Sequence, residues 1–405
     1  MRLKDFSVLN PQYKGESLDC EVSFVPMESL RNGAIDYQDI PFAEGKGKYT
    51  YFQDGDLLVA KVTPCFENGN IAIANNMKQG VGFGSSEIFV LRMNDKVLNT
   101  YMFYITQTAK FQEGACATMC GVGGLKRISP LFMRTYELDI PSLSKQQRIV
   151  DYLDAKLGKI DARIAVLVKQ QNAYARLKKS VIHQAVTRGL DPNVSLKDSG
   201  VEWIGMIPEH WETKRMKDIF STYSTGLTPE SKDETNFSED ERYTWVTIGD
   251  MDSKIVSISN MCLSGKFIKE KTPIISPKGS LLFSFKLSIG KTAFAGKDLY
   301  TNEAIVTIPP RKEIDLNYFY YLIPEVCIEN ATENIYGAKM LNQKIIANML
   351  FAIPSFSEQQ DIAAYLDEKC TKIDAATENI GKQIDALKRL KRALINEVVT
   401  GQRAI

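Results

Sequence analysis

Residues 140–147 read Ile140-Pro141-Ser142-Leu143-Ser144-Lys145-Gln146-Gln147, and residues 353–360 read Ile353-Pro354-Ser355-Phe356-Ser357-Glu358-Gln359-Gln360. The match continues as far as residues 187 and 400 at a constant offset of 213, with 24 of 48 positions identical. The same offset aligns Arg2-Leu3-Lys4-Asp5 with Arg215-Met216-Lys217-Asp218. A repeat on this scale predicts one architecture that is present twice in the chain.

Each copy of the quoted stretch is typical of a strand end, a proline stop and a helix start. We expect Ser144 and Ser357 to cap these helices, because Gln147 and Gln360 follow at the spacing that lets a glutamine reach back to the cap. Glycine at positions 189 and 401 predicts where the helices end. Each helix then spans about 44 residues, or roughly 66 Å at the rise of an α-helix.

Apolar residues recur every seven positions along both predicted helices, which is the pattern of a coiled-coil seam. The ten seam residues are Leu153, Ile160, Leu167, Tyr174 and Val181 in the first helix and Leu366, Ile373, Ile380, Leu387 and Leu394 in the second. The other seam position is mixed and includes Gln171 and Lys178 in the first helix and Lys391 in the second. Such a seam specifies register more than it maximises stability.

The repeat divides the chain into two globular domains, residues 1–143 and 214–356, and each is followed by a long helix, at 144–188 and 357–405. Residues 189–213, which contain proline and several glycines, form the linker between them. Apolar runs predict strands at 55–62, 88–93, 281–285 and 304–308, with helices near 101–112 and 317–329. We therefore expect an α+β fold. Two tandem mixed α/β domains are separated by two long antiparallel helices, with pseudo-two-fold symmetry.

Composition excludes several classes of protein. The chain has 405 residues, of which 44% are hydrophobic and 24% charged, as in an ordinary soluble globular protein. No apolar stretch is long enough to span a membrane, so we expect a cytoplasmic protein without a membrane partner. Seven cysteines without a CxxC pair indicate a reducing compartment, and we interpret them as buried thiols. With His183 and His210 as the two histidines, we expect neither a catalytic nor a metal site on this chain.

Two motifs resemble catalytic ones but are incomplete. Gly290-Lys291-Thr292 could end a phosphate-binding loop, yet that pattern needs a glycine where Phe285 stands. Asn10-Pro11-Gln12-Tyr13 resembles the motif with which amino-methyltransferases hold an adenine, but its second proline is replaced and no cofactor fingerprint accompanies it. Both are interpreted as loops.

Basic residues concentrate in two segments, although the net charge is only +1. Residues 144–188 hold ten Lys or Arg and three Asp. Residues 266–297 hold Glu270 against seven lysines, namely Lys266, Lys269, Lys271, Lys278, Lys286, Lys291 and Lys297. Such runs are either solvated faces or surfaces that neutralise phosphates. The phenylalanines among them, Phe267, Phe283 and Phe285, fit a strand alternation and are predicted core residues.

The duplicated variable domain, in which each copy ends in an Ile-Pro-x-x-Ser-x-Gln-Gln junction and a long helix, resembles the specificity subunit of type I restriction-modification systems. Residues 199–211 strengthen this resemblance. They read Ser199-Gly200-Val201-Glu202-Trp203-Ile204-Gly205-Met206-Ile207-Pro208-Glu209-His210-Trp211, which is similar to the segment that the family places before a target-recognition domain. This chain departs from the family pattern in carrying that segment before its second domain only.

The resemblance implies a non-catalytic reader of double-stranded DNA. Each target-recognition domain would read one half of a bipartite, asymmetric target, while the helices would set the spacer and dock two methyltransferase subunits. Restriction and translocase subunits would join them. S-adenosylmethionine, ATP and Mg²⁺ would belong to those partners, and no cofactor to this chain.

Matching the family's DNA-facing loops onto this chain suggests DNA contacts in both domains, including the loops at 124–127 and 337–339. In the first domain the suggested residues are Lys61, Thr63, Lys126 and Arg127. In the second they are Thr225, Thr228, Lys286, Ser288, Lys291 and Lys339. The alternative is a coiled-coil scaffold or adaptor whose domains bind proteins. Such a protein would lack the steep salt dependence of DNA binding.

Overall fold

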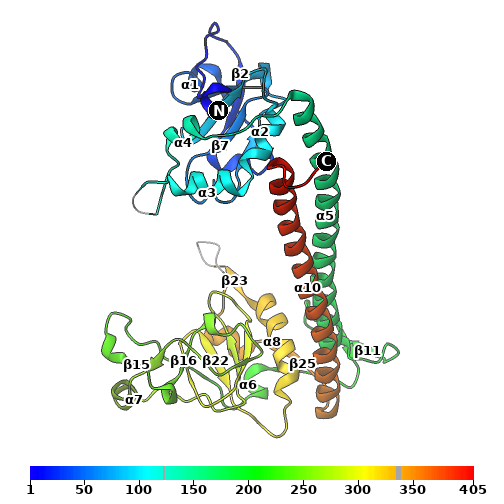
Figure 1. The fold of residues 1–405 in the computed structure, drawn as a ribbon. Coiled ribbons are helices and arrows are strands. Elements are labelled where there is room, and N and C mark those ends of the chain that lie inside the picture. Colours follow the sequence, from blue (N-terminus) through cyan, green and yellow to red (C-terminus); the bar gives the residue numbers. More distant parts are fainter. Residues whose placement is uncertain (122–123, 334–338) are drawn as a thin grey trace. The chain divides into compact units, whose positions relative to one another are not determined.

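The protein is described by a computed structural model that covers residues 1–121, 124–333 and 339–405 (Figure 1). It forms two compact units: unit 1 comprises Met1–Lys169 and Ile380–Ile405, and unit 2 comprises Gln170–Asn379. Two long helices, α5 (Leu143–Arg188) and α10 (Phe356–Val399), contribute to both units. Each unit mixes strands and helices, so the predicted α+β class is confirmed.

Unit 1 contains two four-stranded sheets. One is antiparallel and has the order β1 (Ser7–Leu9), β10 (Ile88–Met93), β7 (Leu57–Ala60), β8 (Ile71–Ile73). The other has the order β5 (Gln38–Pro41), β2 (Glu21–Val25), β9 (Val81–Gly84), β6 (Thr50–Gln53), and its β2–β9 pair is parallel. All four residues of β7 are buried, which explains why its sequence is continuously apolar rather than alternating.

Short elements complete unit 1. The helices are α1 (Phe42–Gly45), α2 (Asn99–Thr106), α3 (Ala109–Ala117) and α4 (Pro130–Thr135), with 3₁₀ turns η1 (Leu3–Asp5), η2 (Met27–Ser29) and η3 (Lys78–Gly80) and the strand pair β3 (Leu30–Arg31) and β4 (Ala34–Ile35). The single helix predicted near 101–112 is wrong. The chain breaks at Thr108, whose hydroxyl accepts a hydrogen bond from the Phe111 backbone amide at 3.4 Å and so starts α3.

Unit 2 is built on a five-stranded sheet in the order β14 (Ser224–Thr225), β22 (Ile305–Ile308), β19 (Leu281–Ser284), β20 (Thr292–Ala295), β17 (Ile255–Val256). Its β17–β20 pair is parallel and the others are antiparallel. The two-stranded pairs are β11 (Leu196–Asp198) with β12 (Met206–Pro208), β13 (Glu212–Arg215) with β25 (Leu350–Ile353), β15 (Phe237–Ser238) with β18 (Cys262–Leu263), β16 (Trp245–Val246) with β21 (Tyr300–Thr301), and β23 (Thr332–Glu333) with β24 (Lys339–Met340).

Besides the long helices, unit 2 has four α-helices among its described residues. They are α6 (Met216–Ile219), α7 (Gly265–Lys271), α8 (Leu316–Asn330) and α9 (Gln343–Asn348), with 3₁₀ turns η4 (Glu234–Asn236), η5 (Glu241–Tyr243) and η6 (Ile248–Asp250). Of these helices, α8 packs on β19 and β20 of this sheet. Phe267, Phe283 and Phe285 are buried as predicted, but Phe267 lies on α7 and not on a strand. Trp211 of the predicted linker is fully buried in the unit 2 core together with Ile204 and Ile207.

The predicted caps of the long helices are wrong by two residues. Ser142 accepts from the Lys145 amide at 3.4 Å, and Ser355 accepts from the Glu358 amide at 3.3 Å. The Glu358 carboxylate accepts in return from the Ser355 amide at 3.2 Å, which completes a capping box. Ser144 and Ser357 therefore lie inside the helices, because the serine directly after each proline already occupies the cap position.

A buried glutamine joins each long helix to its globular part. Gln146 donates to the carbonyls of Lys96 and Pro141, both at 2.9 Å, and accepts from the Leu98 amide at 2.9 Å. Gln359, at the 213-residue offset, donates to the Pro354 carbonyl at 3.1 Å and accepts from the Asp315 amide at 3.0 Å. Both side chains are almost fully buried, so these hydrogen bonds satisfy backbone groups that have little access to water.

A tyrosine on the globular side repeats the same relationship. Tyr104 donates its hydroxyl to Asp154 of α5, and Tyr321 donates to Asp367 of α10. Asp154 and Asp367 are 213 residues apart. Burial, and then the acceptor carboxylate, raise the pKa of both tyrosines far above the usual range, so both stay protonated donors.

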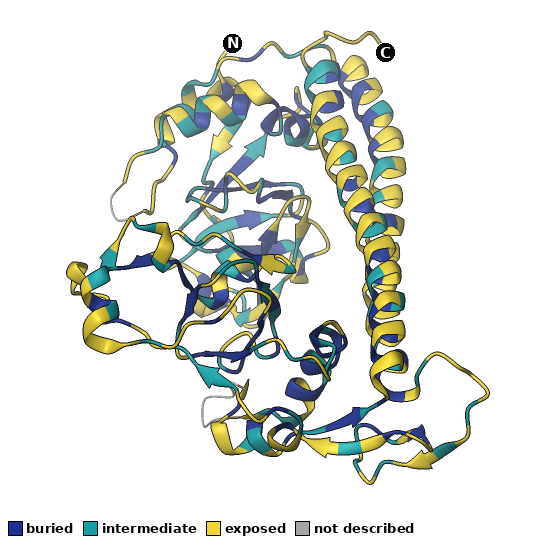
Figure 2. Cartoon of the chain, turned by 90° about the horizontal axis from the view of Figure 1, so that it is seen from below, coloured by how far each residue is buried: buried dark blue, intermediate teal, exposed yellow. Residues whose placement is uncertain are grey.

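The seam of the helix pair follows the predicted seven-residue spacing. In unit 1, Leu153 and Leu157 share a core with Leu394 and Val398, and in unit 2, Leu366 packs in one core with Ala185 and Val186. All ten seam residues are buried or half-buried, and Figure 2 shows the buried stripe along both helices with exposed residues outside it. Gly189 directly follows α5 with a φ of 73°, the left-handed conformation expected of a helix stop.

The prediction that all seven cysteines are buried is wrong. Cys262, Cys327 and Cys370 are buried, but Cys20 and Cys120 are exposed, and Cys65 and Cys116 are half-buried. The exposed ones lie outside helices and sheets, where a small side chain needs no core partner. Within the described ranges, no helix combines the length and the apolar character needed to cross a lipid bilayer.

Candidate nucleic-acid interface

Two loops meet at one end of the buried strand β7 in unit 1. The Thr63 amide donates to the Lys126 carbonyl at 3.0 Å, and the Lys126 amide donates to the Thr63 hydroxyl at 3.0 Å. Two residues further on, the Ile128 amide donates to the Lys61 carbonyl at 2.9 Å. The structure thus brings together the four residues predicted for the first domain, Lys61, Thr63, Lys126 and Arg127.

These four side chains differ in how available they are. Lys126 is exposed, and among the described residues its ammonium has no ion-pair partner. Arg127 is also exposed, but its guanidinium holds Glu87 through three hydrogen bonds of 2.8–3.2 Å. This contact, more than any other, lowers the pKa of Glu87, so the carboxylate stays ionised and Arg127 stays paired in the free protein.

Lys61 is held more tightly than an ordinary surface lysine. Its ammonium donates to the Ser86 carbonyl at 2.6 Å and lies 4.6 Å from the centre of the Phe89 ring. Burial lowers the pKa of Lys61, although the nearby Glu87 carboxylate opposes this. Lys61 is therefore a cation that neighbouring groups hold in one position.

The corresponding place in unit 2 is the loop between β19 and β20. The Leu341 amide donates to the Phe285 carbonyl at 3.1 Å, which brings β24 with Lys339 close to the loop that holds Lys286 and Ser288. On the other side of Phe285, its amide donates to the Ala304 carbonyl at 3.0 Å. Lys339 is the 213-offset equivalent of Lys126, and both are exposed. Gly337 and Ala338, from the same suggested loop, lie outside the described residues.

The two threonines predicted for the second domain lie beside this loop cluster. The Glu303 amide donates to the exposed Thr228 hydroxyl at 3.4 Å, directly before Ala304. Thr225 is half-buried in β14, where it pairs with Val306 of the central sheet. Thr228 is thus presented outward near Lys286, whereas the backbone of Thr225 is engaged in the sheet.

Lys291 differs from Lys286 in its contacts. Its ammonium lies 2.5 Å from Asp252 and donates to the Ile248 carbonyl at 3.0 Å. Lys286 lies 5.6 Å from the centre of the Phe285 ring and, within the part of the chain that the structure describes, forms no ion pair. Of the two, Lys286 is the cation that can meet a phosphate without breaking an existing pair.

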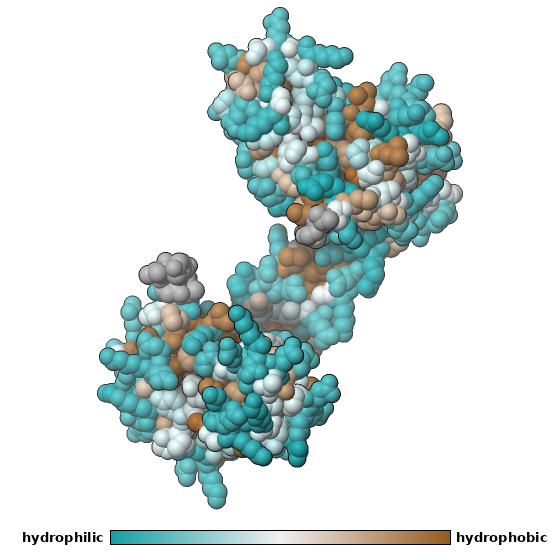
Figure 3. All heavy atoms as spheres, turned by 90° about the vertical axis from the view of Figure 1, so that its left-hand side faces the viewer, coloured by the Kyte–Doolittle hydropathy of each residue, from teal (hydrophilic) through white to brown (hydrophobic). Residues whose placement is uncertain are grey.

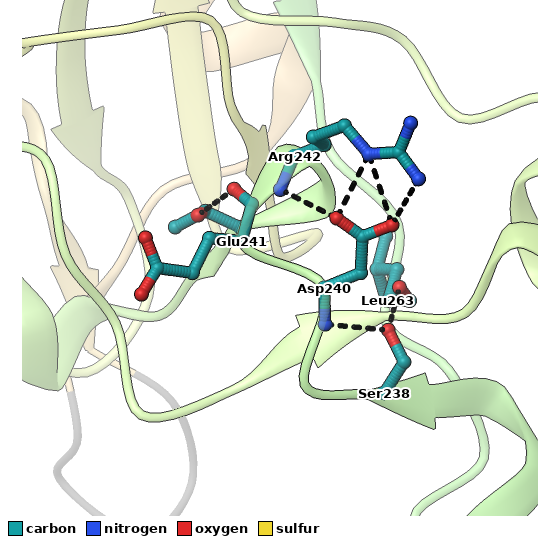
Figure 4. A network of polar contacts seen from close by, with 6 residues as sticks. Ser238, Asp240, Glu241, Arg242 and Leu263 are labelled. Atoms are coloured by element: carbon teal, nitrogen blue, oxygen red, sulfur yellow. Dashed lines mark hydrogen bonds and ion pairs between the residues drawn. The ribbon is translucent and has the colours of Figure 1, made fainter.

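The lysine-rich segment 266–297 is not one surface. Lys266, Lys269 and Lys271 lie on α7 (Figure 1), which packs beside η4, while Lys286 belongs to the loop between β19 and β20. Near α7, Asp240 accepts three hydrogen bonds from the Arg242 side chain at 2.6–3.0 Å (Figure 4). Ser238 holds that turn by donating to the Leu263 carbonyl at 2.8 Å. Arg242 is therefore neutralised locally.

Sequence reasoning missed Glu87, the acid that engages Arg127. A signal was present in the sequence, because Ser86-Glu87-Ile88 in the first domain weakly resembles Asn302-Glu303-Ala304 in the second. In the structure, Ala304 and not Glu303 is the equivalent of Glu87. The Lys61 amide, directly after β7, donates to the Glu87 carbonyl, and the Phe285 amide, directly after β19, donates to the Ala304 carbonyl. Unit 2 therefore has an alanine at the position of the acid.

Comparison with known proteins gives a consistent result. The family model for the "Type I restriction modification DNA specificity domain" matches residues 14–168 and again residues 208–389. The specificity subunit of the type I restriction enzyme EcoEI from Escherichia coli is 31% identical over 193 residues, which cover 42% of this chain and 32% of that protein. The MjaVIII specificity subunit from Methanocaldococcus jannaschii is 22% identical over 96% of this chain and 87% of its own length.

Solved structures show the same fold. A chain from a structure of the type I R-M system superposes with a TM-score of 0.77 over 98% of this chain and 96% of its own, at 16% identity. The chain spans only about a third of the length of the EcoEI and EcoAI specificity subunits from Escherichia coli, 32% and 34%. The fold and the repeated domain are thus shared with these proteins.

Proposed function

The chain belongs to the family of type I restriction modification DNA specificity domains, and from this membership we propose that it is the DNA-reading specificity subunit of a type I restriction-modification enzyme. In this proposal residues 1–143 and 214–356 are two target-recognition domains. Each reads one half of a bipartite duplex target.

One observation carries the proposal: the same pair of loops meets at the same end of the central strand in both units. After β7, the Ile128 amide donates to the Lys61 carbonyl, and after β19, the Leu341 amide donates to the Phe285 carbonyl, two residues along the chain from Lys339. Each junction presents an exposed lysine, Lys126 or Lys339, together with a hydroxyl, that of the half-buried Thr63 or the exposed Ser288. Such groups contact phosphates and base edges. Two unrelated surface clusters would not recur at equivalent places.

The two clusters also differ, which supports an asymmetric target. Unit 1 presents an Arg127–Glu87 pair beside Thr63, while unit 2 has Ala304 in place of the acid and Lys286 with Ser288 on the loop. Glutamate accepts hydrogen bonds that lysine and serine donate, so the two clusters suit different base edges. The two half-sites would then have different sequences.

The helix pair is proposed to set the spacer and to dock two methyltransferase subunits, which restriction and translocase subunits join. A helix of this length spans roughly two turns of duplex, at about 34 Å per turn. The catalytic steps would take place on the partners, with S-adenosylmethionine, ATP and Mg²⁺ bound there. This chain would contribute recognition alone.

Binding of the full chain to a pool of randomised duplexes at rising salt tests the proposal. We expect the logarithm of the binding constant to fall steeply and linearly with the logarithm of salt concentration, because phosphate contacts release counterions. A flat dependence would favour the protein-binding adaptor instead. An adenine-methylation map of the host genome with and without the gene then identifies the target, since one bipartite motif should disappear.

A further inference from the structure

Leu287 stands out in the loop between β19 and β20. Its side chain is 86% exposed, and its φ of 61° lies in the left-handed region that residues with a Cβ seldom adopt. An apolar side chain gains nothing from water, and this backbone conformation is unfavourable for leucine. The free protein therefore offers no stabilising reason for leucine at this position.

The loop around Leu287 is held firmly by its own hydrogen bonds. The Ser284 hydroxyl donates to the Ser288 carbonyl, and the Lys291 amide donates to the Ser284 hydroxyl at 3.1 Å. The Gly290 amide donates to the Ser284 carbonyl at 2.9 Å, and Phe285 is tied to Leu341 at 3.1 Å. Leu287 is thus presented in a fixed place, which lowers the entropic cost of binding through it.

Exposure by itself does not mark a functional residue. Apolar groups are scattered over the largely hydrophilic surface in Figure 3, and Ile258 is 81% exposed without any such setting. Leu287 differs because Lys286 and Ser288 flank it and Lys339 lies on the strand tied to its loop. Cations and a hydroxyl beside an apolar tip form a mixed surface that suits a nucleic-acid groove.

Unit 1 shows the same combination at the equivalent junction. Leu125 is 51% exposed and lies between Gly124 and Lys126, in the loop that contacts Thr63. The two leucines come from different loops, Leu125 from the loop before α4 and Leu287 from the loop after β19. Each loop cluster nevertheless presents one exposed leucine among its cations.

We propose that Leu287 is a base-reading residue. When the loop contacts DNA, its side chain is buried against the bases of one half-site. This inference rests on the proposed function. Duplex DNA offers apolar surface to such a side chain in two ways, the methyl group of thymine and the face of a base exposed by opening a stacked step. The neighbouring lysines would hold the flanking phosphates and so position the leucine.

The test compares three full-length chains on a duplex selected by the wild-type protein from a randomised pool. We expect Leu287→Ala to bind that duplex at least about tenfold more weakly, a change of about 1.4 kcal/mol, because the apolar side chain would no longer be buried against the bases. The slope of binding against salt should stay unchanged, because no charge is removed. Asparagine tolerates a positive φ, so Leu287→Asn should keep the loop conformation. It should still lose the same affinity, which would assign the loss to the leucine side chain and not to a change in the loop.

Ile258→Ala is the matched control. Ile258 follows β17, which runs parallel to β20, so it lies at the opposite end of the sheet from the loop that opens β20. This variant should bind like the wild type. Two base replacements in the selected duplex then distinguish the two kinds of contact. Replacing each thymine by uracil tests a contact with the methyl group, and replacing each adenine by 2-aminopurine tests the opening of a stacked step; either result supports the proposal.

The outcomes separate this inference from the proposed function. If the wild-type chain binds the duplex and Leu287→Ala binds it equally well with the same sequence preference, Leu287 does not read bases. If the wild-type chain shows no salt-dependent binding to any duplex, the proposed function fails and the inference falls with it.

Discussion

The ammonium of Lys178 lies 2.7 Å from the carboxylate of Asp374 in unit 2. In unit 1 the residues at the 213-residue offset, Lys391 and Asp161, form the same ion pair at 2.8 Å. Between the two pairs, the α5 residue moves forward along the chain by as many positions as the α10 residue moves back. The helices α5 and α10 therefore pair antiparallel, with the same register in each unit. The lysines occupy the mixed seam position, where a charged group penalises any shifted register.

These ion pairs should contribute register more than stability. A double-mutant cycle of Lys178→Ala and Asp374→Ala should give a coupling free energy of about 0.3–1 kcal/mol, because both side chains are partly exposed. Asp374→Lys alone should lower the unfolding temperature, and Asp374→Lys with Lys178→Asp should restore most of it. Thermal unfolding measures all five variants; a swapped variant that recovers nothing would contradict a direct pairing.

The buried glutamines should matter more to stability than the ion pairs. Gln359→Ala leaves the Asp315 amide and the Pro354 carbonyl without their partner, at a cost of about 1–3 kcal/mol in unfolding free energy. Gln360→Ala is the control, since that neighbour is exposed and should cost less than about 0.5 kcal/mol. Urea unfolding of both variants decides the matter, and equal midpoints would rule out this role for Gln359.

The loop between β19 and β20 in unit 2 should contribute to the salt dependence of DNA binding. Lys286→Ala together with Lys291→Ala should weaken binding and flatten its salt dependence, since each lost phosphate contact reduces the slope by about one. Lys286→Ala should account for most of this change, because Lys291 is already paired with Asp252. Titrations at several salt concentrations check it, with Lys271→Ala on α7 as a control. An unchanged slope in the double variant would remove this loop from the interface.

The environment of Lys61 predicts a dependence on alkaline pH. Burial lowers its pKa, so on raising the pH Lys61 loses its proton before exposed lysines do. Below its pKa the side chain is positive and can contact a phosphate; above it the charge and this contribution to binding are lost. DNA affinity of the wild type should therefore fall at a lower pH than that of Lys61→Arg, whose guanidinium stays charged. Coincident pH profiles would show that Lys61 takes no part in binding.

The long helices could be predicted because local rules suffice for them. Leu153 and Leu366 begin seven-residue series that need no knowledge of the rest of the chain. The contacts that join the helix starts to the globular parts could not be predicted, since Gln146 and Gln359 accept hydrogen bonds from the backbone amides of Leu98 and Asp315. Those partners lie more than 40 residues away and become neighbours only after folding.

The candidate site was only partly accessible from the sequence for the same reason. The residue types at Lys126 and Lys339 were evident from the repeat. The pairing of Arg127 with Glu87 and of Lys291 with Asp252 was not, because each joins residues about 40 positions apart through the strands between them. These pairs decide which cations remain available.

The sequence by itself determined the duplication, the two long helices and the family, because repeated identity and heptad spacing are properties of the linear order of residues. Tertiary structure decided which loops meet, which charges are neutralised and that Leu287 is held outward on a rigid turn. Strand pairing brings distant residues within hydrogen-bonding distance, and hydrogen bonding and desolvation act over a few ångströms in space whatever the separation along the chain.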